Sequence, residues 1–275
     1  VIGADLPPRV PVHVVPHCFD EDFWPLNHKV RSSERPYRFY SVGAWGERKN
    51  PLGILRAYLH EFTKLDHVQM MLVCEGADLD EVRSLIARSG LPAETLPELH
   101  VPHHGPGTFL NEEELVDLHL EGDCFVSATR GEGWGLPMFE AAILGKTVIA
   151  PHHGGQIDFL TNYPGYRPVR YQLTPCFGSE QRDRVVEHAG QAVQMSRVTM
   201  PPGVDCKQLW AEPDLKDLAT AMRTAYLSST MGRSLPDVTT ERAALEARFG
   251  YKTVGPLLAN LLRGIAWDSR KHSTP

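Results

Sequence analysis

The sequence has no long apolar run, few cysteines and no excess of positive charge. No stretch approaches the roughly 18 consecutive apolar residues of a membrane-spanning helix, so a transmembrane segment is not expected. The five cysteines are odd in number, widely spaced and never in a Cys-x-x-Cys pair. This usage disfavours a disulfide framework and a zinc site, and indicates reduced thiols in the cytosol. The formal net charge of -6 gives no electrostatic basis for binding nucleic acid.

The chain also lacks an initiating methionine and a secretory signal. It opens with VIGADLPPRVPVHVVPHCFD, without the basic start and apolar core of a signal peptide. The cysteine usage predicts a cytoplasmic location, with peripheral contact to a membrane left open. The opening is typical of the interior of a longer protein. We therefore expect either a fragment or a natural protein that lacks its usual first half.

What is present is an alternation of apolar runs and helical patterns. The runs YRFYSVG, VQMMLVCEG, LHVPHHG, CFVSAT and TVIAP predict strands beginning at residues 37, 68, 99, 124 and 147. Continuous apolar runs are typical of parallel strands that are buried on both faces. Helices are expected over 51–62, 78–88 and 137–144, after a cap at Asn111, and over 214–226. Such alternation predicts an α/β fold with a doubly wound parallel sheet.

Three further segments are less regular. PVHVVP, residues 11–16, predicts a short β-type run. Residues 161–210 are irregular with scattered prolines and predict long loops or an insertion. The tail over 239–267 predicts two helices broken near Gly250.

In a doubly wound sheet, ligands bind on the turns that follow the carboxyl ends of the strands. The first such turn, VGAWGERKNP, covers residues 42–51. Gly43 allows a ligand to approach the backbone closely. Arg48 and Lys49 place two cations at a helix start, where free N–H groups also attract anions. The turn is a candidate phosphate site, and the alternative is a solvated basic pair.

The second turn lies in RGEGWGLPMFEAAILGKTVIAPHHGG, residues 130–155. Its alternating glycines would expose successive N–H groups before a helix that starts near Pro137, which is suited to an anion. Glu132 lies in the loop and Glu140 one turn into the helix, so the two are expected to face the same cavity, and carboxylates accept hydrogen bonds from hydroxyls. The pattern predicts a ligand with both phosphate and sugar hydroxyls, whereas the alternative for Glu140 is a solvent-facing helix residue.

Two histidine pairs raise the question of a metal site. They are His103-His104 and His152-His153. Adjacent histidines on a strand point to opposite faces, and no Cys or Asp spacing completes a ligand set. No metal site is expected.

These motifs carry a resemblance to a known family. GERKNP and EGWGLPMFEAAILGKTVIAPHHGG, with Glu-x7-Glu at 132 and 140, resemble the C-terminal donor-binding domain of retaining GT-B glycosyltransferases. That family includes sucrose and glycogen synthases and bacterial mannosyl and glucosyl transferases. VVPHCFDEDFW resembles the family's interdomain linker, with Cys18 in place of the usual glycine, and WAEPDLKDLATAMRTAY resembles its last sheet-flanking helix.

The resemblance covers about Val12 to Tyr226 and implies three parts. They are a linker region over 1–35, a Rossmann-like nucleotide-sugar-binding domain over 36–230, and a C-terminal helical tail over 231–275 that crosses back to a first domain. The resemblance also implies an N-terminal acceptor domain or a partner chain that would complete the enzyme.

Site residues follow from the same resemblance. Arg48 and Lys49 would hold the donor diphosphate and stabilise the leaving nucleotide in place of a metal. Glu132 would meet the transferred sugar, and Glu140 would accept from the ribose hydroxyls. The other implied donor-binding residues are Gly43, His103, Gly105, Gly133, Trp134, Gly135 and Leu136, of which His103 and Gly105 would lie at the nucleotide base.

The implied reaction transfers a sugar from a nucleotide-diphosphate sugar to a glycan, lipid or protein acceptor, with retention of anomeric configuration. It needs neither a metal nor another cofactor. Two alternatives stay open at the level of the sequence. One is a sugar-nucleotide-binding module or subunit without turnover, and the other is a GT-B-fold epimerase or phosphorylase.

Overall fold

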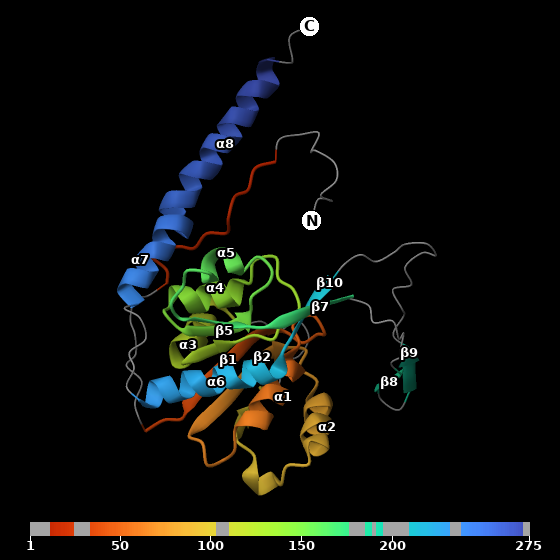
Figure 1. Ribbon diagram of the computed structural model, residues 1–275. Helices are drawn as coiled ribbons and strands as arrows, with labels where there is room; N and C mark the ends of the chain where they lie inside the picture. Colours follow the sequence, from red (N-terminus) through yellow and green to blue (C-terminus); the bar gives the residue numbers. More distant parts are fainter. Residues whose placement is uncertain are drawn as a thin grey trace.

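The computed structural model describes residues 12–24, 34–102, 110–175, 185–188, 191–194, 209–231 and 238–271. Six parallel strands form the central sheet in the order β3-β2-β1-β4-β5-β6 (Figure 1). They are β1 (Tyr37–Ala44), β2 (Val68–Glu75), β3 (Glu98–His100), β4 (Cys124–Val126), β5 (Thr147–Pro151) and β6 (Tyr166–Val169). The prediction of an α/β fold with a doubly wound parallel sheet is confirmed.

Most of the described helices connect and flank these strands, and α8 extends away from them (Figure 1). They are α1 (Pro51–Glu61), α2 (Leu79–Ser89), the 3-10 turn η1 (Ala93–Thr95), α3 (Glu112–Glu121), α4 (Leu136–Ile143), α5 (Ile157–Leu160), α6 (Leu215–Thr230), α7 (Val238–Phe249) and α8 (Tyr251–Lys271). Among the residues that the structure describes, no helix combines the length and apolar character needed to cross a bilayer.

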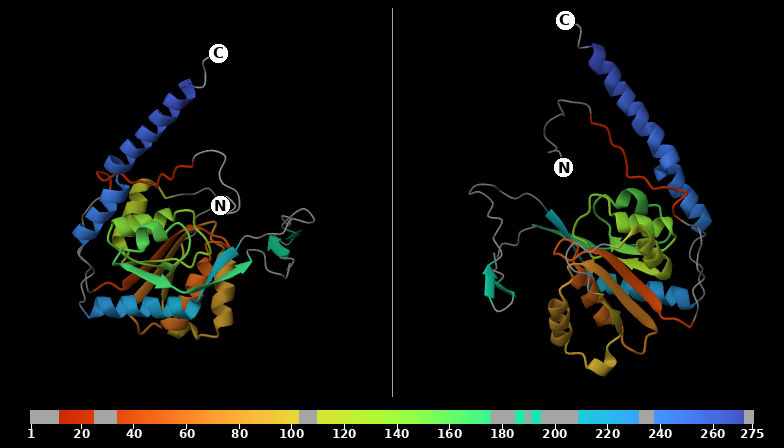
Figure 2. Two further views of the ribbon diagram at one scale, coloured as in Figure 1. Left: turned by 45° about the horizontal axis from the view of Figure 1, so that its top comes forward. Right: turned by 180° about the vertical axis from the view of Figure 1, so that it is seen from behind.

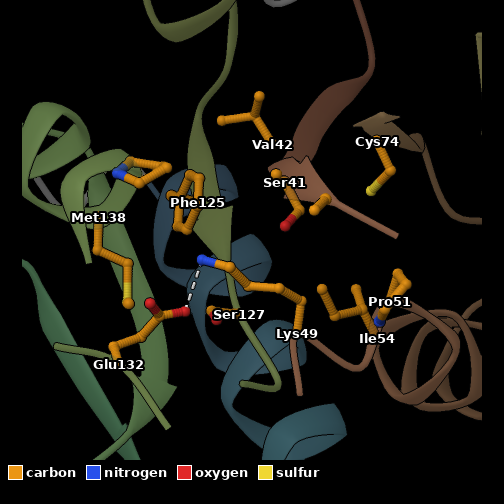
Figure 3. A pocket seen from close by; sticks show the side chains of 13 residues that line it. Ser41, Val42, Lys49, Pro51, Ile54, Cys74, Phe125, Ser127, Glu132 and Met138 are labelled. Carbon is orange, nitrogen blue, oxygen red and sulfur yellow. Dashed lines mark hydrogen bonds and ion pairs between the residues drawn. The ribbon is translucent and has the colours of Figure 1, made fainter. Parts of the chain in front are cut away.

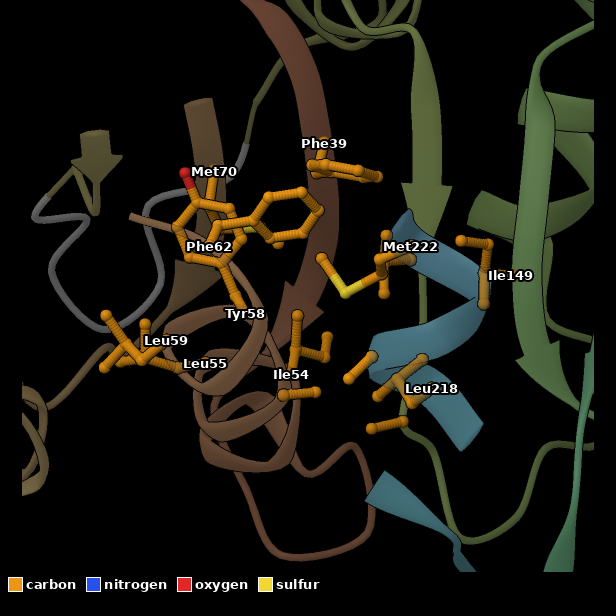
Figure 4. Packing of buried hydrophobic residues seen from close by; sticks show 14 of the residues in the cluster. Phe39, Ile54, Leu55, Tyr58, Leu59, Phe62, Met70, Ile149, Leu218 and Met222 are labelled. Atoms are coloured by element: carbon orange, nitrogen blue, oxygen red, sulfur yellow. The ribbon is translucent and has the colours of Figure 1, made fainter. Parts of the chain in front are cut away.

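Side-chain alternation along the strands builds one core on each face of the sheet. On β4, Cys124 and Val126 join the cluster under α1, α2 and α6, whereas Phe125 joins the cluster under α3, α4 and α5. The first cluster packs Phe39 of β1 and Met222 of α6 against aromatic and aliphatic side chains of α1 (Figure 4). Strands covered on both faces bury nearly every side chain, which explains their continuous apolar runs.

Local hydrogen bonds set the helix starts near the predicted positions. Asn50 adopts a left-handed conformation, with φ 54°, and its side chain accepts from the N–H of Gly53 at the start of α1. Asn111 and Glu114 form a capping box at the start of α3, which satisfies two N–H groups that the helix cannot. At the other end of the chain, α7 ends at Phe249 and α8 begins at Tyr251, which confirms the predicted break near Gly250.

In two of the less regular segments the structure differs from the predicted loops and strands. The expected β-type run over 11–16 forms no strand in residues 12–18. Instead, Phe19 pairs its backbone with Phe249 and Tyr251, at the junction of α7 and α8. Because this junction lies far along the chain, a local pattern could not show it. From the same junction α8 points away from the sheet (Figures 1 and 2).

The segment over 161–210, expected to be long loops or an insertion, contains several strands. β6 adds the edge of the main sheet, β7 (Tyr171–Pro175) pairs antiparallel with β10 (Leu209–Pro213), and β8 (Val185–His188) pairs with β9 (Gln191–Gln194). These strands are four or five residues long, and β6 contains Pro168. Short proline-containing strands at a sheet edge resemble loops in sequence.

Lys146, in the turn between α4 and β5, gives a test of stability against pH. Its Nζ donates to the carbonyl of Leu120 at 3.0 Å, and burial lowers the pKa of Lys146 to about 8. An unfolded lysine titrates near pH 10 (about 10.4), so between these values the unfolded chain binds more protons than the folded one. The free energy of unfolding should therefore rise with pH over this window.

The comparison is with Lys146→Met, measured by urea unfolding from about pH 7.5 to about pH 10. The unfolding free energy of the wild type minus that of the variant should increase as pH rises. A difference that stays constant with pH would show that folding does not perturb Lys146.

Candidate functional site

A crevice opens at the carboxyl ends of β1 and β4, where the order of the strands reverses. β1 leads outward to β2 and β3, whereas β4 leads outward to β5 and β6. Ligands of doubly wound folds bind at such a reversal. The crevice is open to solvent, and the room inside it for water-sized molecules is about 20 Å³. Its lining comes from strand ends and from the first turns of α1 and α4 (Figure 3): Ser41, Val42, Gly43, Ala44, Lys49, Pro51, Ile54, Cys74, Phe125, Ser127, Glu132, Pro137 and Met138.

Two cations and one carboxylate meet across this crevice. Lys49 Nζ lies 2.7 Å from Glu132 Oε1, and Arg48 Nη1 lies 3.2 Å from Glu132 Oε2 (Figure 3 shows the Lys49 pair). The Glu132 side chain is 7% exposed, that of Lys49 25% and that of Arg48 49%. Lys49 therefore reaches into the crevice, whereas Arg48 stays at its rim and also donates to the Gly131 carbonyl at 2.5 Å.

Hydrogen bonds fix the loop that carries Glu132. Thr129 Oγ1 donates to Glu132 Oε1 at 2.9 Å, and the N–H of Arg130 donates to the Arg48 carbonyl at 2.7 Å. The guanidinium of Arg130 makes a two-pronged contact with the carboxylate of Glu212 on β10, at 2.5 and 3.1 Å. The loop is thus tied to the Arg48 turn on one side and to β10 on the other, which gives Glu132 a defined position.

The glycine loop ends in a row of backbone N–H groups that find no acceptor among the described residues. The N–H groups of residues 133–136 donate to no other group in the part of the chain that the structure describes. Gly135, with φ 88°, caps α4 without a side-chain acceptor, and Pro137 follows in the first turn. Free N–H groups at a helix start bind anions, so this row is suited to phosphate or sugar oxygens, as the sequence indicates.

Two residues of that row have different surroundings. A Cβ built on Gly133 would meet nothing within 4 Å, so space for a ligand is present there. The Trp134 indole instead lies in the core, with ring centroids 5.3–5.5 Å from those of Phe139, Phe159 and Phe249. Trp134 can therefore offer a ligand its backbone, while its side chain holds the loop to the core.

Glu140 is not in the same hollow as Glu132. It lies on the face of α4 that turns toward α3, where Glu140 Oε2 is 3.3 Å from His119 Nε2. The Glu140 side chain is 16% exposed. The alternative hypothesis, that Glu140 is a solvent-facing helix residue, is therefore wrong. The second hollow is lined by Cys18, Phe19, Asp20, Phe23, Trp24, Glu112, Leu115, Leu136, Phe139, Glu140, Ile143 and Tyr251.

The remaining predicted residues are placed as follows. Gly43 lines the crevice, and its Cα faces the side chain of Lys49. His103 and Gly105 lie outside the described residues. His152 contacts Tyr166, and no group of three or more potential metal ligands occurs within the described ranges.

Sequence reasoning missed three features of the site. Thr129 ends a predicted strand and carries no motif of its own. The Arg130–Glu212 pair joins residues 82 positions apart, and His119 resembles any polar residue of a helix end. Each of these residues acts through a tertiary contact. It is therefore recognised only from its position near Glu132 or Glu140 in the folded structure.

No family model matches the sequence, and no curated protein matches it. Solved structures do match. The chain aligns with sucrose-phosphate synthase of Thermosynechococcus elongatus at 14% identity and TM-score 0.62, over 93% of this chain and 53% of that one. A glycosyltransferase from Rickettsia africae aligns at 14% identity and TM-score 0.60, over 92% and 57%. HepE of Anabaena, solved with UDP and glucose, aligns at 16% identity and TM-score 0.56, over 92% and 57%.

The chain thus spans a little over half the length of these solved structures. Its six-stranded parallel sheet with flanking helices matches a part of each of them. The chain has the α/β, Rossmann-like fold found in GT-B glycosyltransferases.

Proposed function

We propose that this chain is the donor-binding part of a glycosyltransferase that transfers a sugar from a nucleotide-diphosphate sugar to an acceptor. One observation carries the proposal: the Lys49–Glu132 ion pair spans the crevice at the strand reversal, beside the N–H groups of residues 133–136, which have no acceptor among the described residues. A cation and a row of backbone donors suit a diphosphate, and a buried carboxylate suits sugar hydroxyls.

Each of these groups receives a role in the proposed reaction. When the bond between sugar and diphosphate breaks, negative charge develops on the leaving phosphate oxygen. Lys49 and the α4 N-terminus stabilise that charge, with Arg48 contributing from the rim. Glu132 accepts hydrogen bonds from the transferred sugar and holds it over the crevice. No divalent ion is required in this arrangement, because the cations of the protein supply the positive charge.

The proposal also covers the stereochemistry of transfer, the site of the nucleotide base, the bounds of the domains and the acceptor. Transfer proceeds with retention of anomeric configuration, and the nucleotide base lies near His103 and Gly105. Residues 36–230 form the donor-binding domain, 1–35 a linker region and 231–275 a helical tail. The acceptor is a glycan, lipid or protein held by another domain or partner chain. The support for these points is the Glu-x7-Glu resemblance and the UDP and glucose in the HepE structure, which is similar in fold.

Binding of nucleoside diphosphates by the wild-type chain tests the proposal. Diphosphates should raise the melting temperature, because a ligand that binds only the folded state stabilises it, by about 2.7 kcal/mol at a hundred times its Kd. The matching free nucleosides should raise it far less, since they lack the charge that Lys49 recognises. Treatment with EDTA should leave the shift unchanged. A shift that needs a divalent ion would overturn the metal-free arrangement, and no shift with any diphosphate would overturn the proposal.

A further inference from the structure

His119 is a fully buried polar residue next to Glu140. It lies in the last turn of α3, and its residue exposure is 0%. Both ring nitrogens have partners: Nδ1 lies 2.8 Å from Tyr40 Oη, and Nε2 lies 3.3 Å from Glu140 Oε2. Buried polar groups are costly without hydrogen-bond partners. The series of hydrogen bonds from Tyr40 on β1 through His119 on α3 to Glu140 on α4 therefore needs all three residues.

Aromatic rings hold the imidazole in place. Phe125 of β4 lies parallel to it, with centroids 6.2 Å apart and planes at 26°. Tyr40 and Trp24 approach by their edges, with centroids at 5.4 and 6.2 Å. The ring is therefore enclosed from several sides, and its hydrogen-bond directions are fixed by packing.

The direction of each hydrogen bond follows from the charges around the ring. Burial and the nearby Lys146 lower the pKa of His119, while Glu140 acts in the opposite sense, with burial the largest effect. The neutral ring has a single N–H. An ionised carboxylate can only accept, so Nε2 carries the hydrogen and donates to Glu140, and Nδ1 accepts from the Tyr40 hydroxyl.

This arrangement uses one oxygen of Glu140 and leaves the other. In the described part of the chain, the His119 contact is made to Oε2, whereas Oε1 has no hydrogen-bond partner. The Glu140 side chain is 16% exposed at the second hollow. A carboxylate held by one oxygen leaves the other available to accept a hydrogen bond from a ligand hydroxyl.

We propose that His119 is a positioning residue that orients the Glu140 carboxylate for the ribose of the nucleotide donor. The inference deepens the proposed function and rests on it. His119 itself touches no ligand, because it is fully buried. Its contribution is selectivity for ribose over 2′-deoxyribose, exerted through Glu140.

The test compares the affinities of wild type and variants for a ribonucleoside diphosphate and for its 2′-deoxy analogue. Wild type should prefer the ribonucleotide by about tenfold, the value of one hydrogen bond to a charged group. His119→Phe keeps the ring packing but removes both hydrogen bonds, so the preference should fall toward one. Glu140→Gln should lose the preference as well. The double variant should lose no more than either single one, because both changes break the same interaction.

Two controls separate positioning from general stability. His119→Gln keeps an N–H that can reach Glu140, so it should restore most of the ribose preference. Asn111→Ala removes the cap of the same helix without touching Glu140. It should lower the melting temperature and leave the preference intact. If His119→Phe behaves like Asn111→Ala, His119 is only structural and the inference is overturned.

Two further results distinguish this inference from the proposed function. Imidazole ¹⁵N NMR of the ligand-free protein should show a protonated Nε2 and an unprotonated Nδ1, and the opposite pattern would overturn the positioning role. Wild type that binds diphosphates without any ribose preference would also overturn that role, while the proposed function would stand. Wild type that binds no nucleoside diphosphate would overturn both.

Discussion

Replacing Lys49 by alanine is expected to weaken nucleoside diphosphate binding by roughly ten- to a hundredfold. The scale is that of one hydrogen bond to a charged group, about 1.5–3 kcal/mol, and tenfold in affinity corresponds to about 1.4 kcal/mol. Lys49 has the larger effect of the two cations because its ammonium group lies within the crevice, 2.7 Å from Glu132. Arg48→Ala should have a smaller effect, because its side chain is 49% exposed and solvent screens its charge.

The measurement is titration calorimetry with a nucleoside diphosphate and with the free nucleoside. Affinity for the nucleoside should be the same in wild type and in Arg48→Ala/Lys49→Ala, since neither cation is needed without phosphate. Lys64→Ala, an exposed lysine outside the crevice lining, is the matched control for loss of one positive charge. Unchanged diphosphate affinity in Lys49→Ala would remove this residue from the site.

Gly155→Ala is expected to have the largest effect on the fold of the site. A Cβ at this position would lie 1.8 Å from the carbonyl oxygen of Gly133 and 3.2 Å from the Cα of Trp134. Both are backbone atoms, so no side chain can rotate away. The N–H of Gly155 also donates to the Glu132 carbonyl at 3.0 Å. Overpacking of this kind costs about 1–3 kcal/mol, and it would displace the loop that carries Glu132.

Urea unfolding and diphosphate binding should therefore both suffer in Gly155→Ala. Gly133→Ala is the matched control, because its Cβ would meet nothing within 4 Å. Its unfolding free energy should stay near that of wild type, but the new methyl occupies the space proposed for ligand oxygens, so binding should be lost. Gly133→Ala that melts normally and binds fully would show that the loop does not contact the ligand.

Gly135 differs from Gly133 in its backbone conformation and in the space around it, although both are glycines of the same loop. Its φ of 88° is a conformation that residues with a Cβ resist, and its Cβ would approach Met138 Cε at 2.6 Å. Loss of binding in Gly135→Ala would therefore be accompanied by loss of stability. Only the structure distinguishes the two glycines, because φ and open space are not local properties of sequence.

The sequence by itself determined the order of strands and helices from β1 to β5. Five of the six sheet strands begin within one residue of their predicted starts, because apolar runs buried on both faces need no tertiary context to be identified. The helix caps at Asn50 and Asn111 are equally local, since each cap bonds an N–H three residues ahead. The glycine loop and its position after a strand follow from the same local signals.

The tertiary structure alone decided which of the candidate side chains meet. Lys49 and Glu132 are 83 positions apart and form a pair because β1 and β4 are neighbours in the sheet. Glu140, only eight positions after Glu132, is directed by the turn of α4 to the other hollow, beside His119. Local sequence sets the conformation of each segment, but strand order and helix rotation set distances between side chains. Strand order and helix rotation are fixed by packing across the whole sheet. No single stretch of sequence contains the information about that packing.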